Sequence, residues 1–281
     1  KKIGLETFNN ASDYRQEFFV FGSTVKSVNV TIEGKTIADT AVAVFSYTPH
    51  IHFTNKDSIE VVSIGAKDNP WQKFSQYYRG KKNRIVLVDT AHYAMMKRIR
   101  GIDKIAEQPD STSIIFIFGV QAASSFDIDV VNNVEKKFLN NVVGMLKGKT
   151  RPEEYVIFSG HYDHLGTGSP GEGEPHNGKD SIYNGANDDA AGTTAVIMLA
   201  KYFKALNNND RTLIFATFTA EEIGGYGARY FSKQLPPEKV MAMFNIEMIG
   251  TESKWGRNSA YITGFEKSDM GKILQKNLEG T

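Results

Sequence analysis

Three short apolar runs in the second half of the chain each end in side chains that can bind a metal ion. They span residues 155–160, 211–220 and 240–246, and they are followed by His161, by Glu221 with Glu222, and by Glu247. Runs of this length and composition are typical of buried strands. Residues 188–206, between the first two runs, carry apolar residues at helical spacing. The alternation predicts a mostly parallel sheet with helices on its faces.

A parallel sheet would bring these acidic and imidazole groups together. In open α/β sheets, ligands bind beyond the carboxyl ends of the strands, and all three runs end at that edge. A fourth group, Asp188 and Asp189, lies at the start of the helical segment. We therefore expect four separate stretches of sequence to converge on one site. Asp189 is also an acid that favours the start of a helix.

The composition restricts the ligands of such a site. The chain has no cysteine, so any metal must be held by His and carboxylates, which are ligands that zinc accepts. A two-metal site also needs a carboxylate that bridges ions roughly 3.5–4 Å apart. Asp188, in a Gly-Ala-Asn turn, is the predicted bridge. The 33 basic and 32 acidic side chains give a net charge of +1, which offers no reason to expect a nucleic-acid partner.

The adjacent residues Glu221 and Glu222 can have different roles, one as base and one as metal ligand. Because neighbouring side chains do not easily share a face, Glu222 can bind metal while Glu221 faces the bound water and acts as general base. Asp163 lies two residues beyond His161. Its carboxylate can accept the second imidazole N–H and fix the tautomer of that ligand.

Four ordered segments resemble the motifs of a known enzyme family. "SGHYDHLG", "NGANDDAAGTTAVIMLA", "ATFTAEEIGGYGARYF" and "NIEMIG" are similar to the successive motifs of the di-zinc aminopeptidase family, which includes bacterial leucyl aminopeptidase and, more distantly, glutamate carboxypeptidase. The resemblance implies a zinc exopeptidase fold, a three-layer α/β/α structure with a mixed, mostly parallel sheet. It also implies that His161 and Glu247 bind one zinc, Glu222 binds the other, Asp188 bridges both, and Glu221 is the general base.

The chain departs from the family pattern at two points. The family usually has Asp at the position of Glu247, and its fifth protein ligand is a His well downstream of "NIEMIG", whereas no His follows His176 here. We expect two zinc ions per chain, with the fifth ligand in a segment beyond Thr281; without that His, one zinc is expected. His164 is set aside because it is so near His161, and His176 because it lies in a Gly-rich loop.

The first half of the chain predicts a separate, smaller α/β module. Short β-branched runs alternate with helical segments across residues 25–130, so we expect an inserted domain there. Residues 1–24 and 131–281 would form the peptidase domain, truncated at its C-terminus. The segment "RGKKNRIVLVDT" is similar to a strand of the protease-associated domain that many relatives carry before the metal motifs.

The resemblance implies an aminopeptidase that removes N-terminal residues from peptides, so a peptide is the expected substrate. Glutaminyl cyclase-like activity, carboxypeptidase activity and a non-catalytic peptide-binding role on the same scaffold are the alternatives. No apolar run approaches the about 20 residues that span a bilayer. A secreted or periplasmic location is implied by the family, although no signal peptide is visible. Side-chain specificity and oligomeric state are left open.

Overall fold

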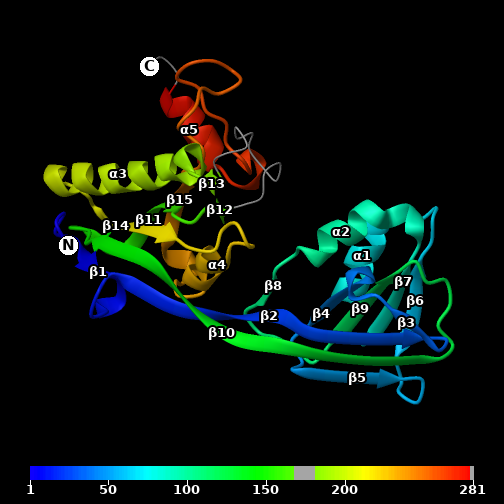
Figure 1. The fold of residues 1–281 in the computed structure, drawn as a ribbon. Coiled ribbons are helices and arrows are strands. Elements are labelled where there is room, and N and C mark those ends of the chain that lie inside the picture. Colours follow the sequence, from blue (N-terminus) through cyan, green and yellow to red (C-terminus); the bar gives the residue numbers. More distant parts are fainter. Residues whose placement is uncertain (168–180, 279–281) are drawn as a thin grey trace. The chain divides into compact units, whose positions relative to one another are not determined.

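The computed structural model describes residues 1–167 and 181–278. It divides into two compact units, one formed by Lys1–Phe18 with Leu139–Thr281 and the other by Phe19–Phe138 (Figure 1). Both boundaries fall inside long strands, β2 (Arg15–Ile32) and β10 (Phe126–Leu146). The predicted boundaries after residues 24 and 130 lie in these same two strands. The assignment of the inserted unit as a protease-associated domain stays a prediction.

The first unit is built on a mixed sheet. Strands β11, β14 and β15 pair in parallel, whereas β14 and β1 each pair antiparallel with β10. The elements of this unit outside β10 are β1 (Glu6–Thr7), β11 (Arg151–His161), β12 (Gly166–Thr167), β13 (Ile182–Tyr183), α3 (Gly192–Leu206), β14 (Arg211–Phe218), α4 (Tyr226–Ser232), β15 (Val240–Asn245) and α5 (Met270–Leu278). The predicted α/β class is therefore confirmed, and the parallel part of the sheet is the part that carries the motifs.

Helices cover both faces of this sheet (Figure 1). Successive side chains of a strand point to opposite faces, and β14 uses both. Leu213 and Phe215 pack with α3, while Ile214 and Phe218 pack in a second core with Phe231 of α4. A strand with apolar residues on both faces needs a helix on each side to exclude water from them. This is the reason for the three layers.

Helix α3 begins later than the sequence predicted. Asp188 and Asp189 have non-helical backbone angles (φ −113°, ψ 94° and φ −130°, ψ 38°), and the peptide bond between them is cis. The regular helix starts at Gly192. The two acids therefore lie in an irregular turn in front of the helix, where their carboxylates can point in different directions.

The second unit contains its own sheet, in the order β4-β9-β7-β6. Alternation along β7 again separates two cores: Ile85 and Leu87 pack with residues of β2, β5 and β10, whereas Val86 and Val88 pack with residues of α2. The elements of this unit outside β2 and β10 are β3 (Lys35–Ile37), β4 (Val42–Ser46), β5 (His50–Thr54), β6 (Glu60–Ile64), α1 (Pro70–Arg79), β7 (Arg84–Val88), α2 (Tyr93–Arg100), β8 (Lys104–Ala106) and β9 (Ser113–Phe118). In the described part of the chain, no helix is both long and apolar enough to cross a membrane.

Candidate metal centre

The carboxyl ends of three parallel strands bring the motif residues to one edge of the sheet. His161 is the last residue of β11 and pairs in register with Phe218, the last residue of β14. Ser159 of β11 pairs with Asn245, the last residue of β15. Glu221 and Glu222 follow β14 within four residues and Glu247 follows β15 within two. The predicted edge therefore exists, and its position follows from the parallel register.

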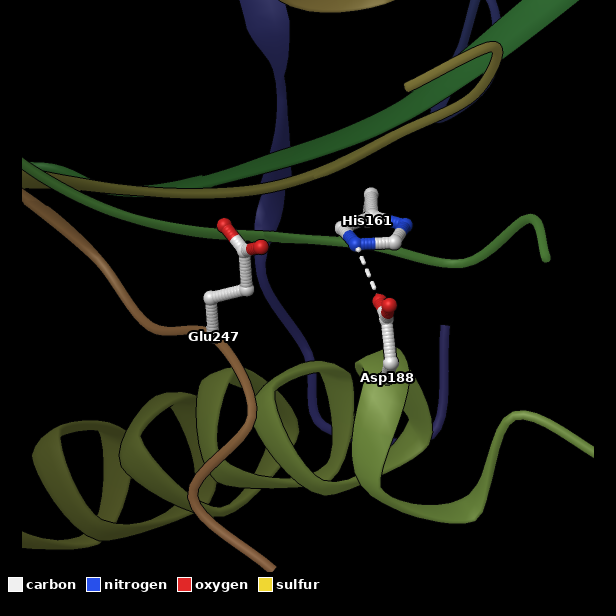
Figure 2. Close-up of side chains that lie close together, drawn as sticks. All are labelled: His161, Asp188 and Glu247. Atoms are coloured by element: carbon white, nitrogen blue, oxygen red, sulfur yellow. Dashed lines mark ion pairs between the residues drawn. The ribbon is translucent and has the colours of Figure 1, made fainter. Parts of the chain in front are cut away.

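His161, Asp188 and Glu247 form a group whose candidate ligand atoms all lie within 4.8 Å of one another (Figure 2). Nε2 of His161 is 3.0 Å from Oδ1 of Asp188. Neither of these two buried atoms makes a hydrogen bond with acceptable geometry. Because a buried polar atom without a partner is costly, and because imidazole nitrogen and carboxylate oxygen are both zinc ligands, a cation between them would satisfy both.

The orientation of His161 suits this role. Its side chain is 3% exposed, and Nδ1 donates a hydrogen bond to the main-chain carbonyl of Asp163 at 3.0 Å. A proton held on Nδ1 leaves the lone pair of Nε2 directed at Asp188. Burial opposes a positive charge on the ring, but the Asp163 carbonyl and the charges of Asp189 and Glu221 outweigh it and raise the pKa of His161.

The carboxylate of Asp163 does not act as the sequence predicted. Its Oδ1 is 3.7 Å from Nδ1 of His161, beyond hydrogen-bond distance. Its two oxygens instead accept the backbone N–H groups of Glu221 and Glu222, at 3.2 and 3.3 Å. The tautomer of His161 is thus fixed by the main chain of Asp163, while the side chain of Asp163 holds the Glu-Glu turn.

A second group of possible ligands was missed in the sequence. His164, Asp188 and Glu222 offer atoms within 4.8 Å of one another, and Nδ1 of His164 is 2.6 Å from Oε1 of Glu222. On the sequence alone we set His164 aside because of its closeness to His161, but in the structure the chain leaves the strand at His161 and the ring of His164 lies beside Glu222. Asp188 belongs to both groups, as expected of a bridge. His176 lies outside the described residues.

Glu221 belongs to neither group. Burial is the main cause that raises the pKa of Glu221, and the negative charges of Glu247, Glu222 and Asp163 act in the same direction. A carboxylate that belongs to neither ligand group and has a raised pKa is a stronger proton acceptor than one with an ordinary pKa.

Two non-glycine residues with positive φ hold the loops that carry the acids. Ala220, before Glu221, has φ 58°, and Met248, after Glu247, has φ 52°. Side chains in this region cost roughly 1–2 kcal/mol, so the surroundings must enforce the turns. The carbonyl of Ala220 accepts the N–H of Tyr226 at 3.0 Å, and the N–H of Met248 donates to Asp189 at 3.1 Å. Nothing in the identity of Ala or Met predicts such a conformation.

Asp189 ties the motif segments together. Asp189 is buried, with 2% of the residue exposed to solvent. Its carboxylate accepts hydrogen bonds from the backbone N–H groups of His161, Gly192 and Met248, at 3.1, 3.2 and 3.1 Å. The hydrogen bond from Gly192 is the kind that an acid makes at the start of a helix. The hydrogen bonds from His161 and Met248 connect β11 and the loop after β15 to the start of this helix. Burial raises the pKa of Asp189 above its ordinary value, although these hydrogen bonds act to lower it.

Residues 141–278 match the family model described as "Peptidase family M28". The chain carries a peptidase family M28 domain. This confirms the resemblance to the di-zinc aminopeptidases. All the motif residues lie within the matched range.

Among curated proteins, Aminopeptidase NAALADL1 of Mus musculus is 26% identical over 135 residues, covering 45% of this chain and 16% of that protein. A probable zinc metalloprotease of Leptosphaeria maculans is 32% identical over 117 residues, covering 41% of this chain and 25% of that protein. The chain therefore spans a quarter or less of the length of these relatives.

Solved structures of aminopeptidases are also similar. An aminopeptidase from Aneurinibacillus sp. strain AM-1 is 19% identical with a TM-score of 0.46, covering 84% of this chain and 60% of that one. A zinc aminopeptidase from Bacillus subtilis is 15% identical with a TM-score of 0.42, covering 97% of this chain and 68% of that one.

Proposed function

We propose that this chain is a zinc-dependent exopeptidase, and that it acts as an aminopeptidase on peptides with a free N-terminus. The observation that supports this most directly is the pair of ligand groups that share Asp188 at the carboxyl edge of the sheet. Each group combines one imidazole with two carboxylates, a donor set that zinc accepts. The matched family and the names of the relatives point in the same direction.

In this proposal His161, Asp188 and Glu247 would hold one zinc ion, and Asp188 and Glu222 would hold the other. The bound ions would supply Lewis acidity, which lowers the pKa of water and polarises the scissile carbonyl. Glu221, which neither group uses, takes a proton from the attacking water and delivers it to the leaving amine. Asp163 keeps Glu221 and Glu222 in place through their backbone N–H groups.

A substitution of the proposed base tests the mechanism. Glu221→Gln is expected to keep its zinc content, because Glu221 is not a ligand, and to lose about 10²–10⁴-fold in kcat, the usual contribution of a positioned base. The measurements are metal analysis and hydrolysis of amino-acid anilides by the purified chain. A variant with full turnover would remove Glu221 from the mechanism.

The substrate class needs a separate comparison. Peptides with free and with blocked N-termini, and a peptide that begins with glutamine, distinguish the possible reactions on this scaffold. Cleavage that requires a free N-terminus supports the aminopeptidase. Release of C-terminal residues from blocked peptides would favour a carboxypeptidase. Cyclisation of an N-terminal glutamine by protein that binds one metal would favour a glutaminyl cyclase. Metal-free, folded protein that hydrolyses none of them would indicate a binding protein.

A secreted or periplasmic location is part of the same proposal. It is supported by the family resemblance alone, and it is tested by locating the full-length protein in fractionated cells.

A further inference from the structure

We propose that the second unit binds an extended peptide with an acidic side chain, which adds as a short strand to an open edge of β2. The residues concerned take no part in the proposed zinc chemistry, so this site can exist or be absent independently of that chemistry. The observation behind the proposal is an interruption in the pairing of β2, with a cavity beside it.

One side of β2 is paired at two places and open between them. On this side β8 pairs with β2 at residues 21–23, and β3 pairs with it at residues 30–32 (Figure 1). The other neighbour of β2 is β10. Within the described part of the chain, no strand pairs with residues 24–29 on the open side. Since alternate residues of a strand direct their N–H and C=O groups to the same side, this stretch presents unpaired main-chain donors and acceptors.

The edge is open because the chain turns away from β2 at both ends of the stretch. After β3 it enters a short 3-10 helix (Asp39–Ala41), and it reaches β8 from the end of α2. Continuing the register of β3 would place Asp39 opposite Val28. Continuing the register of β8 would place Asp103 opposite Thr24. At about 3.4 Å per residue, the open stretch is about 20 Å long and takes a strand of about four to six residues.

A cavity of about 610 Å³ lies beside the open stretch. It is lined by residues 23–28 of β2, 42–44 of β4 and 100–104, together with Asp39. Its volume falls in the range of about 300–1,000 Å³ that is usual for ligand pockets. Residues 24–27 are all exposed, whereas a strand with one covered face would alternate. The stretch is therefore accessible to a ligand along its length.

The charges around the cavity favour a peptide with an acidic side chain. Among the lining residues, the cations Lys26, Arg100 and Lys104 outnumber the acids Asp39 and Asp103. Lys104 is half-buried, and its ammonium donates to the main-chain carbonyl of Arg100 at 3.4 Å. Burial and the charge of Arg100 lower the pKa of Lys104, against the charge of Asp103. A carboxylate brought by a bound peptide would compensate this charge through a charge-assisted hydrogen bond.

The competing explanation is an edge that is only protected against aggregation. Edge strands are often blunted by lysine, and Lys26 lies in the open stretch. A protected edge needs only solvent beside it, whereas residues 100–104 line the same cavity as this edge. When a peptide is added to a sheet edge, main-chain hydrogen bonds supply the affinity and side-chain pockets the specificity. The two explanations therefore differ in whether the main chain of a peptide is recognised.

The first test is the binding of a synthetic peptide to the full chain by calorimetry. The peptide has about six residues, the length that the open stretch accepts, and alternates valine and threonine around one central glutamate. It is acetylated and amidated, so that an exopeptidase cannot shorten it. Two isomers carry N-methyl groups on one or the other alternate set of amides, because only one set can face β2. One isomer should bind like the parent peptide, and the other about 100-fold more weakly because it lacks the donors.

Hydrogen exchange locates the bound peptide. The amides of residues 24–29 should exchange more slowly when the parent peptide is added. The matched control is β6, an edge strand of the sheet β4-β9-β7-β6 in the same unit, whose exchange should not change. Equal slowing at β6 would show that the peptide adds to edges without selection.

The second test concerns the charge. Lys104→Met should weaken binding of the glutamate peptide about 10-fold and leave binding of the same peptide with glutamine unchanged. Lys56→Met, which removes an exposed lysine after β5, is the matched control and should bind both peptides like the wild type. Equal affinity of the wild type for the glutamate and glutamine peptides would overturn the acidic partner.

Three further results would overturn the proposal. The first is no saturable binding of the parent peptide up to about 1 mM, the weak end of specific affinities. The second is equal affinity for the two N-methylated isomers, which would mean that the main chain is not recognised. The third is a dimer in sedimentation that slows exchange at residues 24–29 without peptide, which would make a second copy of the chain the occupant.

Discussion

Gly192→Ala is expected to damage the metal centre although the backbone angles of Gly192 suit any residue. Gly192 has φ −67° and ψ −45°, so alanine would favour the helix by about 1 kcal/mol. A Cβ there, however, would lie 2.1 Å from the carbonyl oxygen of Ile246 and 2.5 and 2.6 Å from the two carboxylate oxygens of Asp189. Carbon and oxygen pack no closer than about 3.3 Å, so the backbone at Ile246 must retreat by about 1 Å.

The cost of that retreat exceeds the gain in helix propensity. Overpacking costs about 1–3 kcal/mol, and the hydrogen bonds from Gly192 and Met248 to the charged Asp189 are worth about 1.5–3 kcal/mol each when they break. We expect a net destabilisation of at least about 3 kcal/mol. Because Glu247 follows Ile246 directly, a shift of this size also displaces a proposed ligand and should lower kcat/KM about 100-fold.

Three quantities are measured: the stability to urea, the rate of hydrogen exchange of the α3 amides by mass spectrometry, and the zinc content. Gly101→Ala is the matched control, since Gly101 has φ −83° and its nearest neighbour, the carbonyl oxygen of Arg98, would be 3.5 Å from the new Cβ. The control should change stability by less than about 1 kcal/mol. If Gly192→Ala unfolds at the wild-type urea concentration and exchanges α3 amides at the wild-type rate, the steric reasoning is refuted.

Two further predictions concern the protonation and the support of the site. In metal-free protein, the pKa of His161 is raised above its ordinary 6.5, so its stabilising contribution is complete below pH 6.5 and lost as pH rises through the raised value. NMR titration of the ring should give a midpoint above 6.5, and zinc affinity should weaken on acidification from that midpoint downward; a midpoint below 6.5 contradicts the reasoning. Asp163→Ala removes the acceptor for two backbone N–H groups and should lower activity or zinc affinity about 10–100-fold. Asp163→Asn should be less affected. Wild-type kinetics and zinc content in the alanine variant would show that the Glu-Glu turn keeps its conformation without Asp163.

The positions of the proposed ligands at one sheet edge were predictable from the sequence. The parallel register of β11, β14 and β15 follows from apolar runs separated by helical segments, and parallel strands end on the same side. Residue chemistry then predicted which side chains there can bind a cation. His161, Asp188 and Glu247 form such a group, as do Asp188 and Glu222 with a third residue. Their roles stay predictions until metal is measured.

The sequence failed where the outcome depends on the path of a short loop. Asp163 and His164 lie two and three residues after His161, and nothing in their order tells which carboxylate oxygen or ring nitrogen faces which partner. The structure directs the Asp163 side chain to the backbone of the Glu-Glu turn and the His164 ring to Glu222. The backbone angles that produce these directions are enforced by contacts distant in sequence, such as the approach of Gly185 to His164.

The amino-acid sequence by itself therefore determined the class of fold, the edge of the sheet that carries the chemistry, and the kinds of ligand available there. These follow from local periodicity and from the ordinary preferences of side chains, which act over a few residues. Only the tertiary structure decided that Asp189 joins three segments and that His164 stands beside Glu222. Those outcomes depend on angstrom-scale contacts between distant parts of the chain, which no local pattern encodes.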